Sequence, residues 1–116
     1  VHAEAADYAQ TDGAEIVGLY DLLLRAEPSP VVARNRAVAV AMRDGPLAGL
    51  ELVDALLAEG ELDGYRLAHA ARADLCRRLG RREEAARSYE RALALSRQDA
   101  ERRFLQRRLA QMQAAG

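Results

Sequence analysis

The chain has 116 residues, of which 50% are hydrophobic, 30% charged and 4% aromatic, with one Cys and a formal net charge of −1. This is the length of one ordinary domain, which can bury a core without disulfides or metal ions. A single Cys excludes an internal disulfide framework, and no apolar run reaches the roughly 18 residues of a membrane span. We therefore expect a soluble, cytoplasmic protein with no membrane partner.

The small net charge conceals a strong asymmetry along the chain. Residues 1–64 carry 4 Arg and 12 acidic residues, a net charge of −8, whereas residues 65–116 carry 13 Arg and 6 acidic residues, a net charge of +7. A chain polarised in this way can be built to pair with itself or with a charged partner.

The beginning of the chain suggests that it belongs to something longer. It starts at Val1 rather than Met, and its Ala-rich opening has no helix start signal of its own. We expect residues 1–12 to be the end of an upstream helix and a linker, followed by a helical domain over residues 13–116. The chain is thus interpreted as a C-terminal fragment.

Apolar residues at helical spacing, separated by Gly, Pro and Asp turn signals, predict an all-α fold. The expected helices cover residues 14–25, 31–43, 46–58, 63 or 64 to 79, 82–95 and 99–113. Ser29 is a good N-cap with Pro30 in the first helical position, and Gly80 is a natural C-cap. The stretch 37–42 is apolar nearly all round, which predicts a helix buried on every face. Short loops between these helices indicate antiparallel hairpins.

One segment, residues 69–93, places small residues, a Gly and an aromatic residue at fixed spacings: Ala73, Gly80, Ala85, Tyr89 and Ala92. This pattern resembles a tetratricopeptide repeat, in which small residues let two helices touch, Gly makes the turn and the aromatic ring fills the gap to the next repeat. His69, Arg72 and Arg97 depart from the usual Trp, Leu and Pro. Gly45 is an earlier turn Gly, 35 residues upstream of Gly80.

With Tyr20 and Pro28 at the aromatic and closing positions of a half-repeat, we expect half a repeat, one degenerate repeat and one good repeat. The stretch from Gly45 to Ala48 is two residues shorter than its counterpart, which makes the middle repeat degenerate. The amphipathic last helix suits the polar cap that helical solenoids require. The predicted architecture is therefore a short stack of hairpins, a tetratricopeptide-like solenoid with a C-terminal capping helix.

The strings IVGLYDLLLRAEPSPVVARNRAVAVAMRDGPLAGLELVDAL, LDGYRLAHAARADLCRRLGR and AERRFLQRRL carry a narrower resemblance, from about Ala14 to Leu109. They resemble the C-terminal extension of a bacterial group of extracytoplasmic-function RNA polymerase sigma factors. The family-like residues are Tyr20, Pro28, Pro30, Asn35, Arg36, Gly45, Pro46, Tyr65, Arg72, Asp74, Gly80, Arg81, Tyr89, Glu101, Arg102 and Arg103. Gly13 and Arg66 depart from the Trp and His that are common in the family.

The resemblance implies a regulatory, protein-binding domain that modulates transcription initiation. Its implied partners are RNA polymerase or the sigma factor's own upstream regions, and those upstream regions, rather than this fragment, would bind DNA. A generic tetratricopeptide adaptor that binds a peptide is the alternative. A third interpretation is direct DNA contact through the last helix.

No residue pattern predicts catalysis. His2 and His69 are the only histidines, too few for a metal site or a Ser-His-Asp triad. The glycines form no phosphate-binding loop, and we interpret His69 as a helix-packing residue and Cys76 as a small core residue. We therefore expect no enzyme, no cofactor, no metal and no small-molecule substrate.

Candidate binding residues lie on the first helix of each hairpin, since helical repeats bind partners in the groove those helices line. They are Asn35, Arg36, Tyr65, His69 and Arg72. Asn35 and Arg36 either make buried hydrogen bonds that lock neighbouring helices or face the groove, and both readings stay open. A candidate basic contact surface on the last helix consists of Arg102, Arg103, Arg107 and Arg108.

Overall fold

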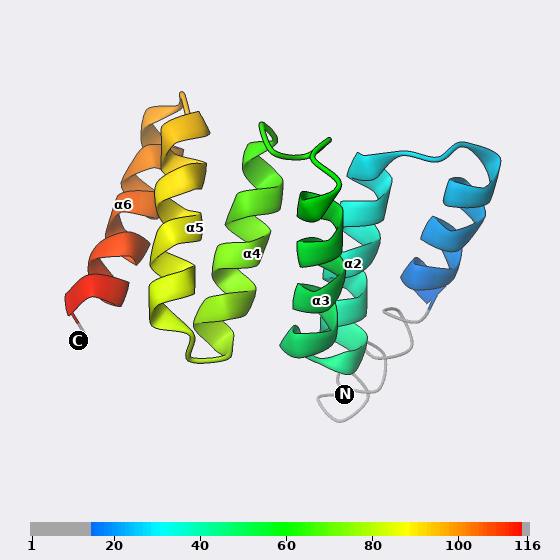
Figure 1. The fold of residues 1–116 in the computed structure, drawn as a ribbon, viewed down its shortest axis with the longest axis horizontal. Coiled ribbons are helices and arrows are strands. Elements are labelled where there is room, and N and C mark those ends of the chain that lie inside the picture. The colour runs from blue at the N-terminus through cyan, green and yellow to red at the C-terminus, as the bar shows by residue number, and fades with distance from the viewer. Residues whose placement is uncertain (1–14, 115–116) are drawn as a thin grey trace, which may run out of the picture.

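A computed structural model describes residues 15–114, and every regular element within them is an α-helix (Figure 1). The first helix covers residues 15–26. The others are α2 (Pro30–Asp44), α3 (Pro46–Ala58), α4 (Arg66–Arg78), α5 (Arg82–Leu95) and α6 (Asp99–Ala114). The predicted all-α class is confirmed for this part of the chain, whereas the predicted boundary between residues 12 and 13 lies outside it. No helix of residues 15–114 is long and apolar enough to cross a membrane.

The helices from α2 onward form a row in which each one packs against its neighbours in sequence, with the chain direction alternating along the row (Figure 1). Tight turns make this possible. The Ser29 hydroxyl accepts a hydrogen bond from the Val32 N–H at the start of α2, with Pro30 in the first turn. After α4, the Gly80 N–H donates to the Arg77 carbonyl and the Arg81 N–H to the Cys76 carbonyl, a Schellman closure that requires the positive φ of Gly80 (76°).

Small side chains hold α4 and α5 close together. Ala73, Ala85 and Ala92 are fully buried, and the Tyr89 ring is 2% exposed in the same cluster. Leu105 of α6 closes this cluster from the other side of α5. The small residues and the aromatic residue of the repeat pattern therefore form the core between these helices, and Gly80 makes the turn that joins them.

An equally close approach joins α2 and α3 at Gly49. A Cβ there would overlap the Cβ of Ala41 and lie 3.1 Å from the Ala37 carbonyl oxygen. Gly49 stands at the fourth position of α3, as Ala85 does in α5. The sequence comparison aligned Ala48 with Ala85, but in the fold Gly49 is the residue at the helix contact.

Two expectations about helix boundaries and burial are wrong. α4 begins at Arg66 rather than at residue 63 or 64, because hydrogen bonds from the Asp63 N–H to the Gly60 carbonyl and from the Tyr65 N–H to the Leu62 carbonyl form turns that occupy this stretch. α2 is not buried on every face, since Met42 is 64% exposed. α2 is covered by α3 and by helix 15–26, and its remaining side is open.

Candidate functional site

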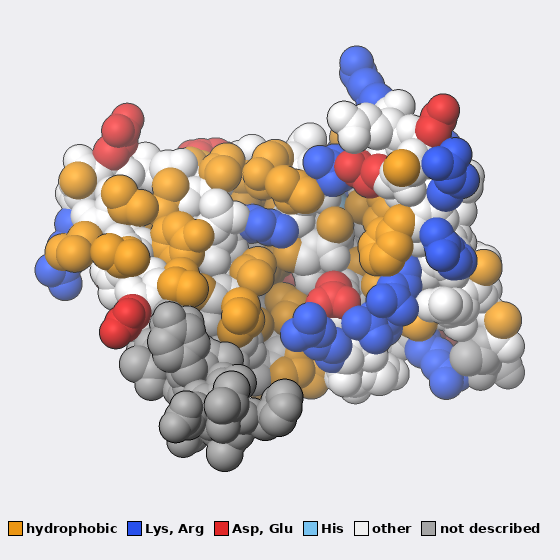
Figure 2. All heavy atoms as spheres, turned by 180° about the vertical axis from the view of Figure 1, so that it is seen from behind, with side chains coloured by type: hydrophobic (Ala, Val, Ile, Leu, Met, Phe, Trp, Pro, Cys, Tyr) orange, Lys and Arg blue, Asp and Glu red, His pale blue; other side chains and the backbone are white. Residues whose placement is uncertain are grey.

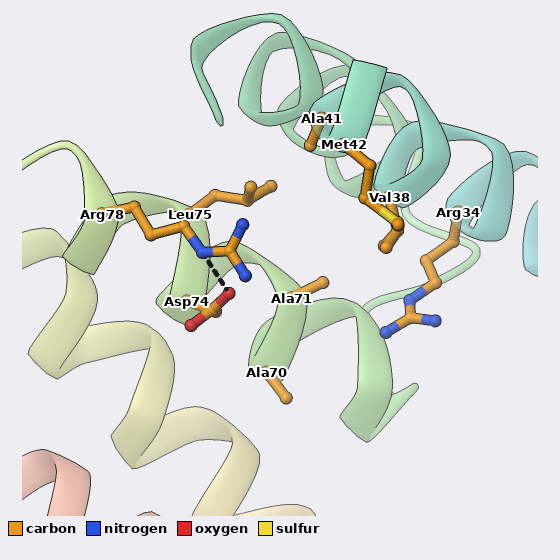
Figure 3. A pocket seen from close by; sticks show the side chains of 9 residues that line it. All are labelled: Arg34, Val38, Ala41, Met42, Ala70, Ala71, Asp74, Leu75 and Arg78. Carbon is orange, nitrogen blue, oxygen red and sulfur yellow. Dashed lines mark ion pairs between the residues drawn. The ribbon is translucent and has the colours of Figure 1, made fainter. Parts of the chain in front are cut away.

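The open side of α2 faces α4 across a groove of about 400 Å³ (Figure 3). Val38, Ala41 and Met42 of α2 form one wall, and Ala70, Ala71 and Leu75 of α4 form the other. Arg34 lies at one end and the Asp74–Arg78 pair at the other (Figure 3). A concave apolar surface with a few charged groups is the usual form of a binding site, and its volume is within the range of such sites.

The groove exists because the two helices present small or flexible side chains to each other. α3 packs against both α2 and α4, and no described segment fills the space in front of it. The short side chains of Ala70 and Ala71 project little from α4, and Met42 on the opposite wall is largely exposed. A thioether side chain adapts its shape to what it contacts, which suits a surface that receives a partner.

Arg34 is an unusual cation at its end of the groove. Its Nη1 donates to the Asn35 side-chain oxygen at 2.8 Å and its Nη2 to the Leu67 carbonyl at 3.1 Å. Its Nε is buried without a hydrogen-bond partner. No carboxylate of residues 15–114 forms an ion pair with it, and burial lowers the pKa of the guanidinium.

At the opposite end of the groove, the cation Arg78 already has a carboxylate partner. Asp74 accepts from Arg78 at 2.9 Å and from Arg77 at 2.7 Å. These two pairs lie along α4 at spacings of four and three residues, where such pairs commonly form. The groove therefore has one end with a compensated charge and one end, Arg34, where the positive charge is uncompensated.

The structure places Asn35 and Arg36 in contacts within the chain. Asn35 accepts the hydrogen bond from Arg34 that holds the guanidinium beside the groove. The Nε of Arg36 lies 2.6 Å from Asp21 of helix 15–26, which ties that helix to α2. The contact of Arg36 fits the interpretation in which these residues lock neighbouring helices, whereas the contact of Asn35 lies within α2 and leaves both interpretations open for that residue.

The candidate residues Tyr65 and His69, at the start of α4, lie away from the groove lining. Tyr65 is the extended residue before α4, and the Nε2 of the buried His69 lies 2.6 Å from the Asp63 carbonyl oxygen. His69 thus packs against the turn that precedes its own helix. Arg91 of α5 also reaches this turn, with Nη2 3.3 Å from the Asp63 carboxylate.

Arg72 joins three helices. Its Nε lies 2.7 Å from Asp54 of α3, and its Nη2 and Nη1 lie 3.0 Å and 2.9 Å from Glu84 and Ser88 of α5. Burial acts to lower the pKa of Arg72, but the hydrogen bond and charge of Asp54, with the charge of Glu84, raise it overall. The side chain is 21% exposed, so its fork of donors is directed at the chain itself.

The four arginines of α6 divide into two kinds. Arg102 donates to the Leu93 and Ser96 carbonyls at the end of α5, at 2.9 Å and 3.0 Å, and so caps that helix. Arg108 lies over the Phe104 ring at 5.4 Å, while Arg103 and Arg107 are exposed. Figure 2 shows the molecule from the side opposite to that of Figure 1. On this side, arginine side chains gather over the half that contains α6, and hydrophobic side chains over the half that contains helix 15–26.

The remaining reactive side chains are placed as follows. Cys76 is a free, fully buried thiol, as expected for a small core residue, and burial raises its pKa. His2 lies outside the described residues. Among residues 15–114, no group of three His, Cys, Asp or Glu side chains is arranged to hold a metal ion.

Sequence reasoning missed the residues that line the groove. Arg34, Val38 and Met42 recur every four residues, and so do Ala71 and Leu75 on α4. This spacing places each set on one helical stripe. The signal was present, but the same apolar residues also fit the interpretation of a helix buried on all sides.

Comparisons with known proteins add one relative. The chain is 44% identical over 110 residues to an uncharacterized protein of Rhizobium meliloti (strain 1021). The match covers 94% of this chain and 25% of that protein, so the chain spans about a quarter of the length of the curated relative it matches. No family model matches the chain, and no solved structure matches it.

Proposed function

We propose that this chain is a protein-binding domain that holds a partner segment in the groove between α2 and α4. The observation that carries the proposal is the groove itself, an open apolar surface with a cation at one end. Met42 leaves apolar surface exposed in this groove, and grooves lined by the first helices of hairpins are where helical repeats bind.

We further propose that the hairpins form a tetratricopeptide-like solenoid. Support comes from Ala73 and Ala85, which are buried in one cluster as expected for small residues at a helix contact, and from Tyr89, whose ring is buried in the same cluster. The equivalence of Gly49 with Ala85 reduces the shortfall of the middle repeat after its turn Gly from two residues to one. In the alternating row of helices in Figure 1, the closest packing is between neighbours in sequence, as is typical of such stacks.

The biological setting that fits best is the C-terminal regulatory domain of a bacterial extracytoplasmic-function sigma factor. The support is the sequence resemblance, which covers nearly the whole chain. In this setting the groove receives a segment of RNA polymerase or of the sigma factor's own upstream regions, and so modulates transcription initiation in the cytoplasm. The domain would act by binding, with no catalytic step and no cofactor.

The test is transcription in vitro with the full-length sigma factor and with a form that lacks this domain. Met42→Glu, which places a charge on the groove wall, is compared with Leu47→Glu, since Leu47 is an exposed apolar residue of α3 that does not line the groove. We expect deletion and Met42→Glu to change promoter output and Leu47→Glu to leave it unchanged. Unchanged output on deletion contradicts the regulatory proposal.

A generic peptide-binding adaptor shares the groove but not the transcriptional effect, so the same experiment separates the two. Direct DNA contact through α6 has less support than the sequence suggested, because Arg102 is occupied at the end of α5. If phosphate contacts occurred through Arg103 and Arg107, DNA affinity would fall steeply with salt concentration. A binding titration of the chain at several salt concentrations measures this.

A further inference from the structure

The uncompensated charge of Arg34 indicates what the groove binds. Seven other arginines of residues 15–114 form ion pairs with carboxylates: Arg36, Arg43, Arg66, Arg72, Arg77, Arg78 and Arg91. Arg34 is contacted only by neutral acceptors although it is half-buried. A partly desolvated cation without a counter-charge is unfavourable, and an anionic group placed against it relieves that cost.

The surroundings of Arg34 increase this cost. The carbonyl that it contacts belongs to Leu67, in the first turn of α4, where the helix dipole is positive. Burial is the main cause that lowers the pKa of Arg34, and the charge of Arg66 adds to it, against opposing contributions from Tyr65 and Tyr20. Arg102 likewise has no carboxylate partner, but it lies against the C-terminal carbonyls of α5, where a cation is favoured. Arg34 therefore differs from it in needing an anion from outside.

The anion must come with an apolar group, because the charge borders an apolar wall. Val38 follows Arg34 by one helical turn and Met42 by two, which at 1.5 Å per residue places them about 6 Å and 12 Å further along the groove. A carboxylate and an aliphatic side chain about 6 Å apart stand one turn apart on a helix. A nucleic acid offers phosphates but no aliphatic side chain to cover Val38, Met42 and Leu75.

From this we infer that the groove selects a protein segment in which an Asp or Glu pairs with the Arg34 guanidinium and an aliphatic side chain one helical turn away packs between Val38, Met42 and Leu75. The inference rests on the proposed function, since it names the chemistry of the partner that the groove would hold. Asn35 acts as a positioning residue, because its side-chain oxygen fixes Nη1 of Arg34. The Asp74–Arg78 pair leaves the other end of the groove without such a preference.

The test selects a displayed library of random peptides, about 12 residues or three helical turns long, against the immobilised full chain. We expect bound peptides to carry an acidic and an aliphatic residue three or four positions apart. Binding of the best peptide is then measured by fluorescence anisotropy with Arg34→Gln, with Met42→Glu and with Arg25→Gln. Arg25 is an exposed arginine of helix 15–26 outside the groove, so it controls for the loss of one positive charge.

Arg34→Gln is expected to weaken binding about tenfold to hundredfold, the usual effect of losing a charge-assisted hydrogen bond, and Arg25→Gln less than about twofold. Arg34→Glu is expected to reverse the preference, so that the peptide with Lys in place of its acid binds this variant better than the original peptide. This reversal does not follow from a purely structural role. Circular dichroism shows whether each variant is folded.

Two results would overturn the inference in distinguishable ways. Peptides without an acid, whose binding is lost with Met42→Glu but unchanged with Arg34→Gln, would remove the carboxylate preference and leave the groove as a binding site. Peptides whose binding depends on neither residue, or no bound peptides at all, would remove the proposed groove function as well.

Discussion

The connection that Arg72 makes between α3, α4 and α5 predicts a measurable loss of stability when its charge is removed. Arg72→Met keeps most of the alkyl chain, so packing of the stem is retained while the guanidinium is lost. The variant removes the contacts with Asp54, Glu84 and Ser88, which lie 2.7, 3.0 and 2.9 Å from the guanidinium nitrogens.

The size of the effect follows from the exposure of the partners. The side chains of Asp54 and Glu84 are 45% and 36% exposed, so solvent screens each pair to about 0.2–1 kcal/mol. Ser88 is buried, and its hydrogen bond adds about 0.5–1.5 kcal/mol. We expect Arg72→Met to lower the free energy of unfolding by about 1–3 kcal/mol and the Tm by about 4–12 °C.

Thermal unfolding followed by circular dichroism measures the change. Arg87→Met is the matched control, since Arg87 is an exposed arginine of α5 that forms no ion pair. Asp54→Asn should lower the Tm by a smaller amount, and Arg72→Met should have less effect in that background, because the two groups share one interaction. If Arg72→Met melted within roughly 1 °C of the unchanged protein, the ion-pair network would not stabilise the stack.

Three further substitutions and one labelling reaction test other contacts. Gly49→Ala should destabilise the chain by about 1–3 kcal/mol because the new methyl group overlaps Ala41, whereas Gly18→Ala, where nothing lies within 4 Å, should stabilise it by about 0.5–1 kcal/mol. Asn35→Ala should lower the Tm by about 4 °C, since Arg34 loses an acceptor worth about 1 kcal/mol; an unchanged Tm would return Asn35 to a binding role. The thiol of Cys76 is buried, and burial raises its pKa. We expect a thiol reagent to label it no faster than the protein unfolds, when both rates are measured in urea. Rapid labelling of the native protein would contradict its burial.

The helices were predictable because their signals are local. Ser29 with Pro30 starts α2, and Gly80 ends the turn after α4, in each case through a hydrogen bond within a few residues. The predicted start of α4 is too early because side chains further along the chain also contact the turn over residues 60–64. His69 and Arg91 both contact Asp63, and no local pattern signals those contacts.

The site was harder to predict because a polar residue on a helix does not reveal its partner. Arg72 was expected in the groove, but its guanidinium reaches Asp54, 18 residues away in sequence. The sequence does not show that Arg34 lacks a carboxylate partner, whereas Arg36, two positions later, has Asp21 as its partner. Pairing depends on which helices become neighbours, so an unpaired arginine can be recognised only once the fold is known.

The charge asymmetry of the sequence is partly explained by the same pairing. The acidic first half and the basic second half meet in Asp54–Arg72 and Asp63–Arg91, where an acid from residues 1–64 binds an arginine from residues 65–116. Part of the charge asymmetry is therefore used in ion pairs between consecutive hairpins. Arg34 has no carboxylate partner, so its charge is the one that remains for recognition in the groove.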